Sequence, residues 1–209
     1  MADGAIEYPW TAAAEGLAED ESLVARAGRD PAAAGRLYDR YYDRIAGYLY
    51  RCTGDPILTE DLTANVFLAA FQHLGRFRWR RTPFEAWLYR IATNEVRMHL
   101  RRRRRLRFWS LQSEDPQHQD AISRLQSADP PAAEPCMVAE SHHLLQKALI
   151  ELDPKYRTVV VLRYYESKSL SEISVITEQR QGTVKSQLHR ALEQLQDRLT
   201  HLGVLGAEP

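Results

Sequence analysis

The sequence predicts an all-α protein made of two small helical domains joined by a flexible linker. Apolar residues recur at helical three-and-four spacing through residues 22–109 and again through 141–200. No stretch shows the strict apolar and polar alternation that is typical of a β-strand. The intervening residues 110–140 are rich in Gln, Ser, Asp, Pro and Ala, a composition that is poor in core-forming side chains. An acidic extension at residues 1–21 and a tail at 201–209 complete the expected organisation.

The first domain begins with an amphipathic helix whose apolar face is rich in tyrosine. Its members lie at helical spacing: Leu37, Tyr38, Tyr41, Tyr42, Ile45, Tyr48 and Leu49. Asp55 then supplies an N-cap and Pro56 a first-turn proline, so a second helix should follow to about Leu74. Its apolar stripe is Leu58, Leu62, Val66, Phe67 and Ala70.

A third helix should begin near Thr82, where Thr82, Pro83 and Glu85 have the pattern of a capping box with proline at the first helical position. Its apolar face leads directly into the arginine run that ends at Arg107. The sequence therefore predicts that this run is the end of a long helix.

Charge is strongly segregated, although the formal net charge is zero. Residues 74–107 carry twelve arginines against two glutamates, while residues 1–21 and 111–140 are acidic. Such a basic block suits a phosphate backbone. The alternative is a solvated helix face, which normally mixes both signs. If the acidic segments fold back on the basic block, they should mask it in the free protein.

The second domain has the outline of a helix-turn-helix. Asp153 and Pro154 open one helix, and Ser169 with Glu172 forms a capping box that opens a short one. A longer stripe follows after a polar turn: Val184, Leu188, Ala191, Leu192, Leu195 and Leu199. If that stripe faces the core, four polar side chains lie opposite, where a recognition helix contacts DNA: Lys185, Ser186, His189 and Arg190. The alternative is a surface helix of a bundle.

Aromatic residues are interleaved with arginines in the first domain. Trp79 lies among arginines in an expected loop, which suits stacking on unpaired bases. Phe84 and Trp87 are expected to be core residues instead.

Signatures of other functions are missing from the sequence. It has no phosphate-binding glycine loop, no HExxH motif and no Cys or His cluster at zinc spacing, so no catalytic residue, metal or cofactor is expected. The chain has no apolar run long enough for a membrane span and no secretory signal, so we expect no membrane insertion and a cytoplasmic location.

Several motifs in order resemble one family. The first domain resembles region 2 of the extracytoplasmic-function (ECF) sigma factors, a group of the bacterial sigma-70 family, over Tyr38–Tyr42, Thr53–Pro56, Glu60–Phe67, Pro83–Asn94 and the arginine run. The second domain resembles region 4 over Leu152–Arg157, Val161–Tyr164 and Gly182–Ala191.

The resemblance implies an initiation factor that binds the β and β′ subunits of core RNA polymerase, recognises the −10 and −35 promoter elements and promotes strand opening. It also implies an anti-sigma factor as a partner. Carried over by position, polymerase contacts fall on Asp61, Leu62, Asn65 and Val66. Contacts to the opened −10 strand fall on Arg76, Arg78, Trp79, Arg80, Arg90, Asn94 and Arg97. Contacts to the −35 duplex fall on Arg180, Thr183, Lys185, Ser186, His189 and Arg190.

The turn of the helix-turn-helix departs from the family pattern. Glu178, Gln179 and Arg180 stand where the family usually has a turn glycine, an apolar residue and a capping serine. A glutamate disfavours a left-handed backbone by roughly 1 kcal/mol, and the missing cap costs a similar amount.

Two rival functions follow from the residues alone. A repressor or activator could bind intact duplex through the helix-turn-helix without polymerase, and a nuclease would require metal-dependent cleavage. A sigma factor is distinguished by one-to-one binding of core polymerase.

Overall fold

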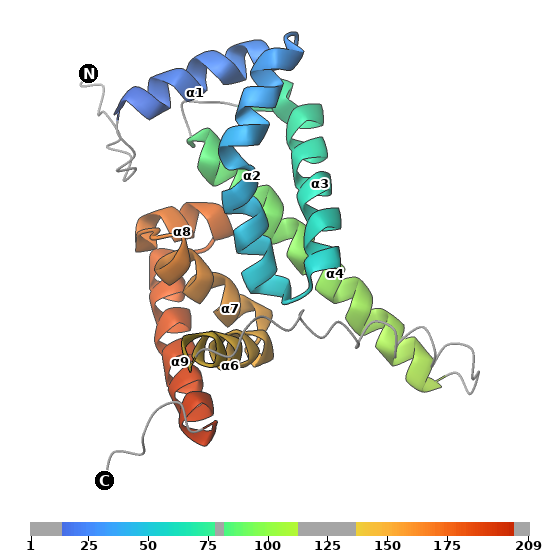
Figure 1. Ribbon diagram of the computed structural model, residues 1–209, viewed down its shortest axis with the longest axis vertical. Coiled ribbons are helices and arrows are strands. Elements are labelled where there is room, and N and C mark those ends of the chain that lie inside the picture. Colours follow the sequence, from blue (N-terminus) through green and yellow to red (C-terminus); the bar gives the residue numbers. More distant parts are fainter. Residues whose placement is uncertain (1–13, 78–81, 113–136, 203–209) are drawn as a thin grey trace.

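The computed structural model describes residues 14–77, 82–112 and 137–202, and every regular element in these ranges is a helix (Figure 1). This confirms the all-α prediction. The first group of helices contains α1 (Ala14–Ala27), α2 (Pro31–Thr53), α3 (Pro56–His73), the 3₁₀ turn η1 (Leu74–Arg76) and α4 (Phe84–Gln112). The second contains α6 (Met137–Glu151), α7 (Pro154–Val160), the π-helical turn η2 (Val161–Tyr165), α8 (Leu170–Thr177) and α9 (Gln181–His201).

An aspartate cap followed by a proline starts three of these helices, and the sequence predicted two of these starts, at α3 and α7. Asp55 accepts a hydrogen bond from the Leu58 amide (3.0 Å) at the start of α3. Asp153 accepts one from the Lys155 amide (3.0 Å) at the start of α7, and Asp30 caps α2 in the same way. Each cap satisfies an amide that has no partner inside its helix.

Helix α4 starts one residue later than predicted and extends through the arginine run. It begins at Phe84, so Pro83 precedes the helix and does not open it. Its end at Gln112 confirms that the arginine run lies within a long helix. Part of the predicted linker is therefore helical, and residues 113–136 lie outside the described residues.

The predicted acidic extension is likewise partly helical, because α1 crosses the boundary expected between residues 21 and 22. In the described part, Glu19 and Asp20 both pair with Arg40 of α2 at 2.6 Å. These two carboxylates therefore bind α2 and not the basic block of residues 74–107, which corrects the masking hypothesis for this part of the segment.

The core of the first group lies between α2, α3 and α4. Its fully buried side chains include Leu37, Ile45, Tyr48, Leu49, Val66, Phe84 and Leu88. Burying an apolar side chain of this size contributes about 1.5–3 kcal/mol before the entropy of ordering it is subtracted. The hydroxyls of Tyr48 and Thr93 lie 2.9 Å apart, which satisfies the polar end of a buried tyrosine.

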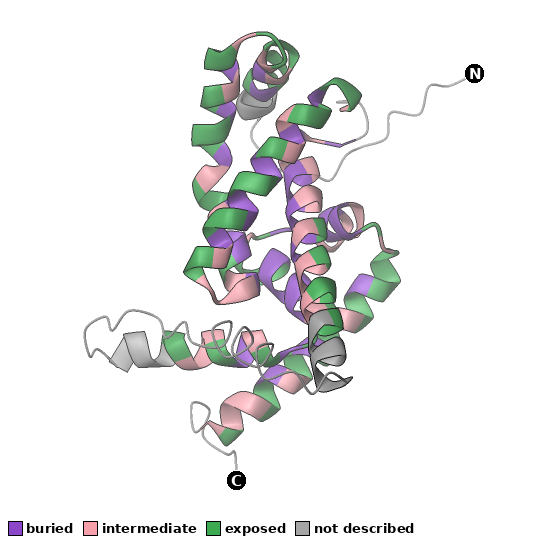
Figure 2. Ribbon diagram, turned by 90° about the vertical axis from the view of Figure 1, so that its right-hand side faces the viewer, coloured by how far each residue is buried: buried purple, intermediate pink, exposed green. Residues whose placement is uncertain are grey.

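The two groups of helices pack directly against each other, a contact that the sequence did not predict. Helices α7 and α8 lie beside α2 and α4 (Figure 1). Buried residues of the second group belong to the same apolar cluster as the core of the first: Val159, Val161, Leu162, Ile173, Ile176 and Val184. Buried positions continue through both groups of helices in Figure 2. We call this contact the interdomain interface.

A buried arginine also crosses this interface. Arg157 of α7 donates hydrogen bonds to the carbonyls of Cys52 in α2 and of Ile150 and Leu152 in the second domain. These carbonyls are at or near helix C-termini, where partial negative charge favours a cation. Burial lowers the pKa of the guanidinium, and the carbonyls compensate in part for its lost hydration.

Candidate nucleic-acid interface

Helix α4 separates core residues from a polar and basic face. Its apolar residues pack inward: Phe84, Leu88, Ala92 and Val96. On another face, Arg90, Asn94, Arg97 and Arg101 follow at intervals of four, three and four residues, so they lie on one side of the helix. Asn94 and Arg101 are exposed, whereas Arg90 and Arg97 are half-buried. The structure therefore brings three of the expected −10 contacts together on α4.

The loop before α4 is described only at its ends. Arg76 is exposed at the end of η1, and Phe77 packs on Trp87 with ring centroids 5.0 Å apart. Phe84 is fully buried and Trp87 half-buried, as expected for core residues. The other expected contacts in this loop, Arg78, Trp79 and Arg80, lie outside the described residues.

The arginine run forms the far part of α4, which projects beyond α2 and α3 (Figure 1). Arg101, Arg102, Arg104 and Arg105 are exposed. Nearby, burial lowers the pKa of His99, and the charges of Arg103 and Arg102 lower it further. The run therefore presents concentrated positive charge, as expected for a surface that binds phosphate.

Arg90 is not free in this structure, because it reaches across the interdomain interface. Its Nη1 lies 3.0 Å from Oε1 of Glu178, and its Nη2 donates to the Val175 carbonyl at 3.4 Å. An expected −10 contact is thus bound to the turn of the helix-turn-helix.

The predicted helix-turn-helix is confirmed as α8, a short turn and α9. Ser169 and Glu172 form the expected capping box at the start of α8. Val184 and Ala191 of α9 are fully buried. The six expected −35 contacts all lie on the exposed part of the first half of α9 or at its N-cap: Arg180, Thr183, Lys185, Ser186, His189 and Arg190. The predicted division of α9 into a core face and a polar face is therefore correct, except that Leu192 of the predicted apolar stripe is 39% exposed.

Two of these side chains have local partners. The Ser186 hydroxyl donates to the Thr183 carbonyl at 2.9 Å, and His189 lies 3.4 Å from Glu193. Arg180, the N-cap of α9, makes no side-chain cap hydrogen bond, as its residue type predicts.

The turn between α8 and α9 adopts the left-handed conformation that its position in the motif requires. Glu178 has φ 57° and ψ 36° and is the C-cap of α8. A non-glycine residue with this backbone is uncommon and strained. The side chain at this strained position is also the one that contacts Arg90.

Helix α3 corrects the expected polymerase contacts. Leu62 is 4% exposed and Val66 is fully buried, so these side chains belong to the core and cannot form a surface contact in this structure. Asp61 and Asn65 are exposed on the opposite side. Two apolar side chains that the motif comparison missed, Ile57 (71% exposed) and Leu68 (57%), lie on the same side as Asp61 and Asn65.

A polar network at the interdomain interface was also missed. The Tyr89 hydroxyl of α4 donates to Glu166 at 2.5 Å, and Glu166 lies 3.7 Å from Arg51. Lys168, 8% exposed, pairs with Glu85 at 2.8 Å. Sequence separation hides such contacts, since Tyr89 and Glu166 are 77 residues apart.

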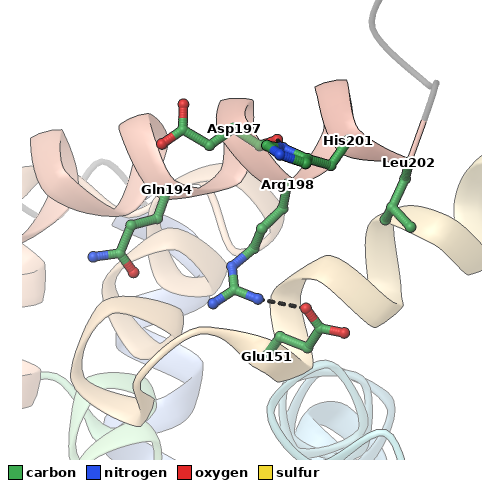
Figure 3. A pocket seen from close by; sticks show the side chains of 6 residues that line it. All are labelled: Glu151, Gln194, Asp197, Arg198, His201 and Leu202. Carbon is green, nitrogen blue, oxygen red and sulfur yellow. Dashed lines mark hydrogen bonds and ion pairs between the residues drawn. The ribbon is translucent and has the colours of Figure 1, made fainter.

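A surface hollow lies at the far end of α9 (Figure 3). Its lining is mostly polar: Glu151, Gln194, Asp197, Arg198, His201 and Leu202. Arg198 donates to Glu151 across it. The hollow lies between the C-terminal half of α9 and Glu151 at the end of α6, and it is separate from the expected −35 contacts in the first half of α9.

Neither a metal-binding cluster nor a membrane-spanning helix occurs among the described residues. These residues contain no group of three or more His, Cys, Asp or Glu side chains placed to hold a metal ion. Among the same residues, no helix combines the length and apolar character needed to cross a bilayer.

Comparison with known proteins gives two family matches in the expected order. Residues 37–106 match Sigma-70 region 2, and residues 142–195 match Sigma-70, region 4. The chain is 32% identical over 174 residues to the ECF RNA polymerase sigma factor SigW of Bacillus subtilis (strain 168), a match that covers 83% of this chain and 92% of SigW. It is also 32% identical over 174 residues to the ECF sigma factor BldN of Streptomyces coelicolor, covering 83% of this chain but 63% of BldN.

Solved structures share the fold. The sigma factor RpoE of Bartonella quintana, determined with the anti-sigma factor NepR, has a TM-score of 0.61 and 20% identity over 79% of this chain and 96% of that chain. CnrH, determined with the cytosolic domain of CnrY, has a TM-score of 0.60 and 23% identity over 88% of this chain and 98% of that chain. The helical order, the two family matches and the identity to SigW agree, and the chain therefore belongs to the ECF group of sigma-70 family RNA polymerase sigma factors.

Proposed function

We propose that this sigma factor divides promoter recognition between two surfaces that its own helices position. The first surface is the basic face of α4 with Arg76, Arg90, Asn94 and Arg97, which would hold the opened −10 strand. The second is the exposed face of α9, which would read the −35 duplex. The protein would act by binding and strand capture and would carry no catalytic residue of its own.

The common face of Arg90, Asn94 and Arg97 on α4 is the observation that carries this proposal. Guanidinium groups bind phosphate, and an amide side chain can hydrogen-bond a base edge. A single strand offers phosphates, free Watson–Crick edges and unstacked base faces along its length, whereas in a duplex those edges are paired and those faces are stacked. Arg78, Trp79 and Arg80 belong to the same proposed surface from the sequence alone.

The −35 surface depends on the rotation of α9. Because Val184 and Ala191 are fixed in the core, Lys185, Ser186, His189 and Arg190 must point outward. A helix that enters the major groove contacts base edges with side chains of its N-terminal half. Arg180 and Thr183 flank the entry and suit phosphate contacts.

The polymerase surface is proposed on the exposed side of α3, at Asp61 and Asn65, with Ile57 and Leu68 as apolar anchors. Exposed apolar side chains beside polar ones are typical of protein interfaces. The β and β′ subunits of core polymerase are the proposed partner there.

An anti-sigma factor is a further proposed partner, because RpoE of Bartonella quintana shares the fold and was determined with one. The division into a region 2 domain and a region 4 domain joined by a linker also remains part of this proposal. Since core polymerase and chromosome are in the cytoplasm of bacteria, the protein would act there.

Reconstituted run-off transcription tests the proposal. Core polymerase is incubated with genomic fragments from the source organism, with and without this protein, and new start sites should depend on it. On a promoter found in this way, Asn94→Ala should reduce permanganate reactivity of the opened strand while the polymerase still co-elutes with the variant.

Lys185→Ala should instead weaken the initial duplex complex by about five- to 150-fold, which corresponds to the roughly 1–3 kcal/mol of one base contact. Lys147→Ala, an exposed lysine of α6 outside both surfaces, is the matched control and should match the wild type. Loss of co-elution with core polymerase in Asn94→Ala would contradict the placement of Asn94 at the −10 strand.

A further inference from the structure

The guanidinium of Arg90 lies at the C-terminal end of α8. It contacts two acceptors there: the Glu178 carboxylate, 3.0 Å from Nη1, and the Val175 carbonyl, 3.4 Å from Nη2. The C-terminus of a helix carries partial negative charge, which adds to the carboxylate. The negatively charged surroundings that Arg90 has in this structure are therefore of the kind that a phosphate group would provide.

Glu178 holds this position despite an unfavourable backbone. Its φ of 57° is left-handed, and the family resemblance places a glycine at this point of the turn. A glycine would fit the backbone without strain but would bring no carboxylate. The pairing with Arg90 therefore belongs to this chain's own turn and not to the general helix-turn-helix pattern.

The closed arrangement cannot bind both promoter elements. The centres of the −10 and −35 elements are 25 positions apart by name, which is about 85 Å of B-form DNA at 3.4 Å per base pair. In this structure a proposed −10 residue and the helix-turn-helix turn are in direct contact at 3.0 Å. The two domains must separate before both surfaces engage DNA, and separation breaks this contact.

We propose that Glu178 is an intramolecular latch whose carboxylate competes with the −10 strand for Arg90. In the free chain Glu178 holds Arg90, and Arg90 is released when the domains separate on polymerase and promoter. This inference rests on the proposed role of Arg90 in binding the −10 strand.

The contact between Arg90 and Glu178 is weak enough to open. Arg90 is 30% exposed and Glu178 63% exposed, so water and salt weaken their attraction. The Nε of Arg90 is buried and has no hydrogen-bond partner among the described residues, so one donor of the guanidinium is unsatisfied while Arg90 is bound to Glu178. The Tyr89–Glu166 and Lys168–Glu85 contacts hold the same interface, so Glu178 controls Arg90 without being the sole contact between the domains.

Binding of a single strand by the full-length protein without polymerase tests the latch. The probe is a fluorescent thymidine oligonucleotide of about twelve nucleotides, and anisotropy gives its Kd at low salt. Glu178→Gln removes the charge but keeps the size and the backbone, and it should bind two- to fivefold more tightly than the wild type, the range expected for a partly exposed pair. Asp43→Asn, at an exposed carboxylate of α2, controls for the general loss of one negative charge and should change Kd less.

A double-mutant cycle with Arg90→Ala makes the test specific. Arg90→Ala alone should weaken binding, and Glu178→Gln in that background should have no effect beyond the Asp43→Asn control. If Glu178→Gln matches the control while Arg90→Ala weakens binding, the latch is refuted and the −10 role of Arg90 stands. If the gain persists without Arg90, Glu178 only repels DNA and the latch is refuted. If Arg90→Ala leaves binding unchanged, both roles of Arg90 fail, while run-off transcription still decides the promoter function separately.

Discussion

Two helices, one in each domain, end at a left-handed C-cap, and the two caps face the other domain in different ways. Gly54 ends α2 with φ 71° and ψ 6°, and Glu178 ends α8 with φ 57° and ψ 36°. A Cβ added at Gly54 would lie 3.0 Å from Cγ1 of Ile150 in α6. Glu178 instead extends its carboxylate to Arg90 of α4. The same backbone conformation thus serves close packing at one turn and a charge contact at the other.

The difference shows why only one of these turns can carry a side chain. At Gly54 the neighbouring helix occupies the space that a side chain would need, so glycine satisfies both the backbone and the packing. At Glu178 the side chain is exposed and contacts its partner through its end, so the contact with Arg90 offsets some of the backbone strain. Substitutions at the two turns should therefore differ in sign and in salt dependence.

The largest effect is expected at Gly54. Gly54→Ala should lower the free energy of unfolding by about 2 kcal/mol, since it combines a left-handed alanine with a tight contact to Ile150. Urea unfolding measures this value, and added salt should leave it unchanged. Gly35→Ala, inside α2 with nothing near the added Cβ, is the control and should raise stability by up to about 1 kcal/mol. Equal effects at both positions would contradict the packing argument.

A smaller, stabilising effect is expected at Glu178 when Glu178→Gly is compared with Glu178→Gln. Glu178→Gly relieves the left-handed strain and loses the ion pair, whereas Glu178→Gln loses only the pair's charge. The Gly variant should therefore be more stable than the Gln variant by about 1 kcal/mol in urea unfolding. The gap between the Gln variant and the wild type should shrink as salt rises from about 50 to 500 mM, because salt screens exposed pairs. A Gly variant no more stable than the Gln variant would show that the turn is not strained.

The smallest effect concerns pH at the same interface. Burial raises the pKa of Glu166 above 4.5, although the Tyr89 hydrogen bond and the charges of Arg51 and Lys168 oppose the rise. The folded protein thus holds this proton more tightly than the unfolded chain, so the linked stability is present below 4.5 and is lost as pH rises through the folded-state pKa.

Glu166→Gln keeps an acceptor for the Tyr89 hydroxyl without an ionisable group. Relative to the wild type, the variant should therefore gain stability as pH rises from about 4 to 7 in urea unfolding. Parallel curves for the two proteins would contradict the assignment.

Much of the fold could be predicted because it depends on local signals. Asp55 with Pro56, Asp153 with Pro154, and Ser169 with Glu172 mark helix starts within a few residues, and the structure confirms all three. The stripe of α9 likewise predicted which of its side chains are exposed, with Leu192 as the exception. Such patterns are readable because capping and helical periodicity act within one or two turns.

The errors and omissions have different causes. Leu62 and Val66 were assigned to polymerase by motif position, although their place in the apolar stripe of α3 already indicated burial. The interdomain contacts could not be predicted, because Arg90 and Glu178 are 88 residues apart in sequence and carry no local signal of their pairing. The left-handed turn was foreseeable from the glycine pattern, but its partner was not.

Separation of the two domains on polymerase and promoter DNA can be measured as a change in distance between one labelled position in each domain. Fluorophores are attached to cysteines introduced at exposed Tyr50 of α2 and Lys147 of α6, with Cys52 and Cys136 replaced by serine. These positions are close in the closed structure, because the neighbouring Gln146 donates to the Tyr50 carbonyl at 3.2 Å. Energy transfer should be high in the free protein and should fall strongly on adding core polymerase and promoter DNA, as the two surfaces move toward elements about 85 Å apart. Unchanged transfer in a complex that is active in transcription would contradict the account.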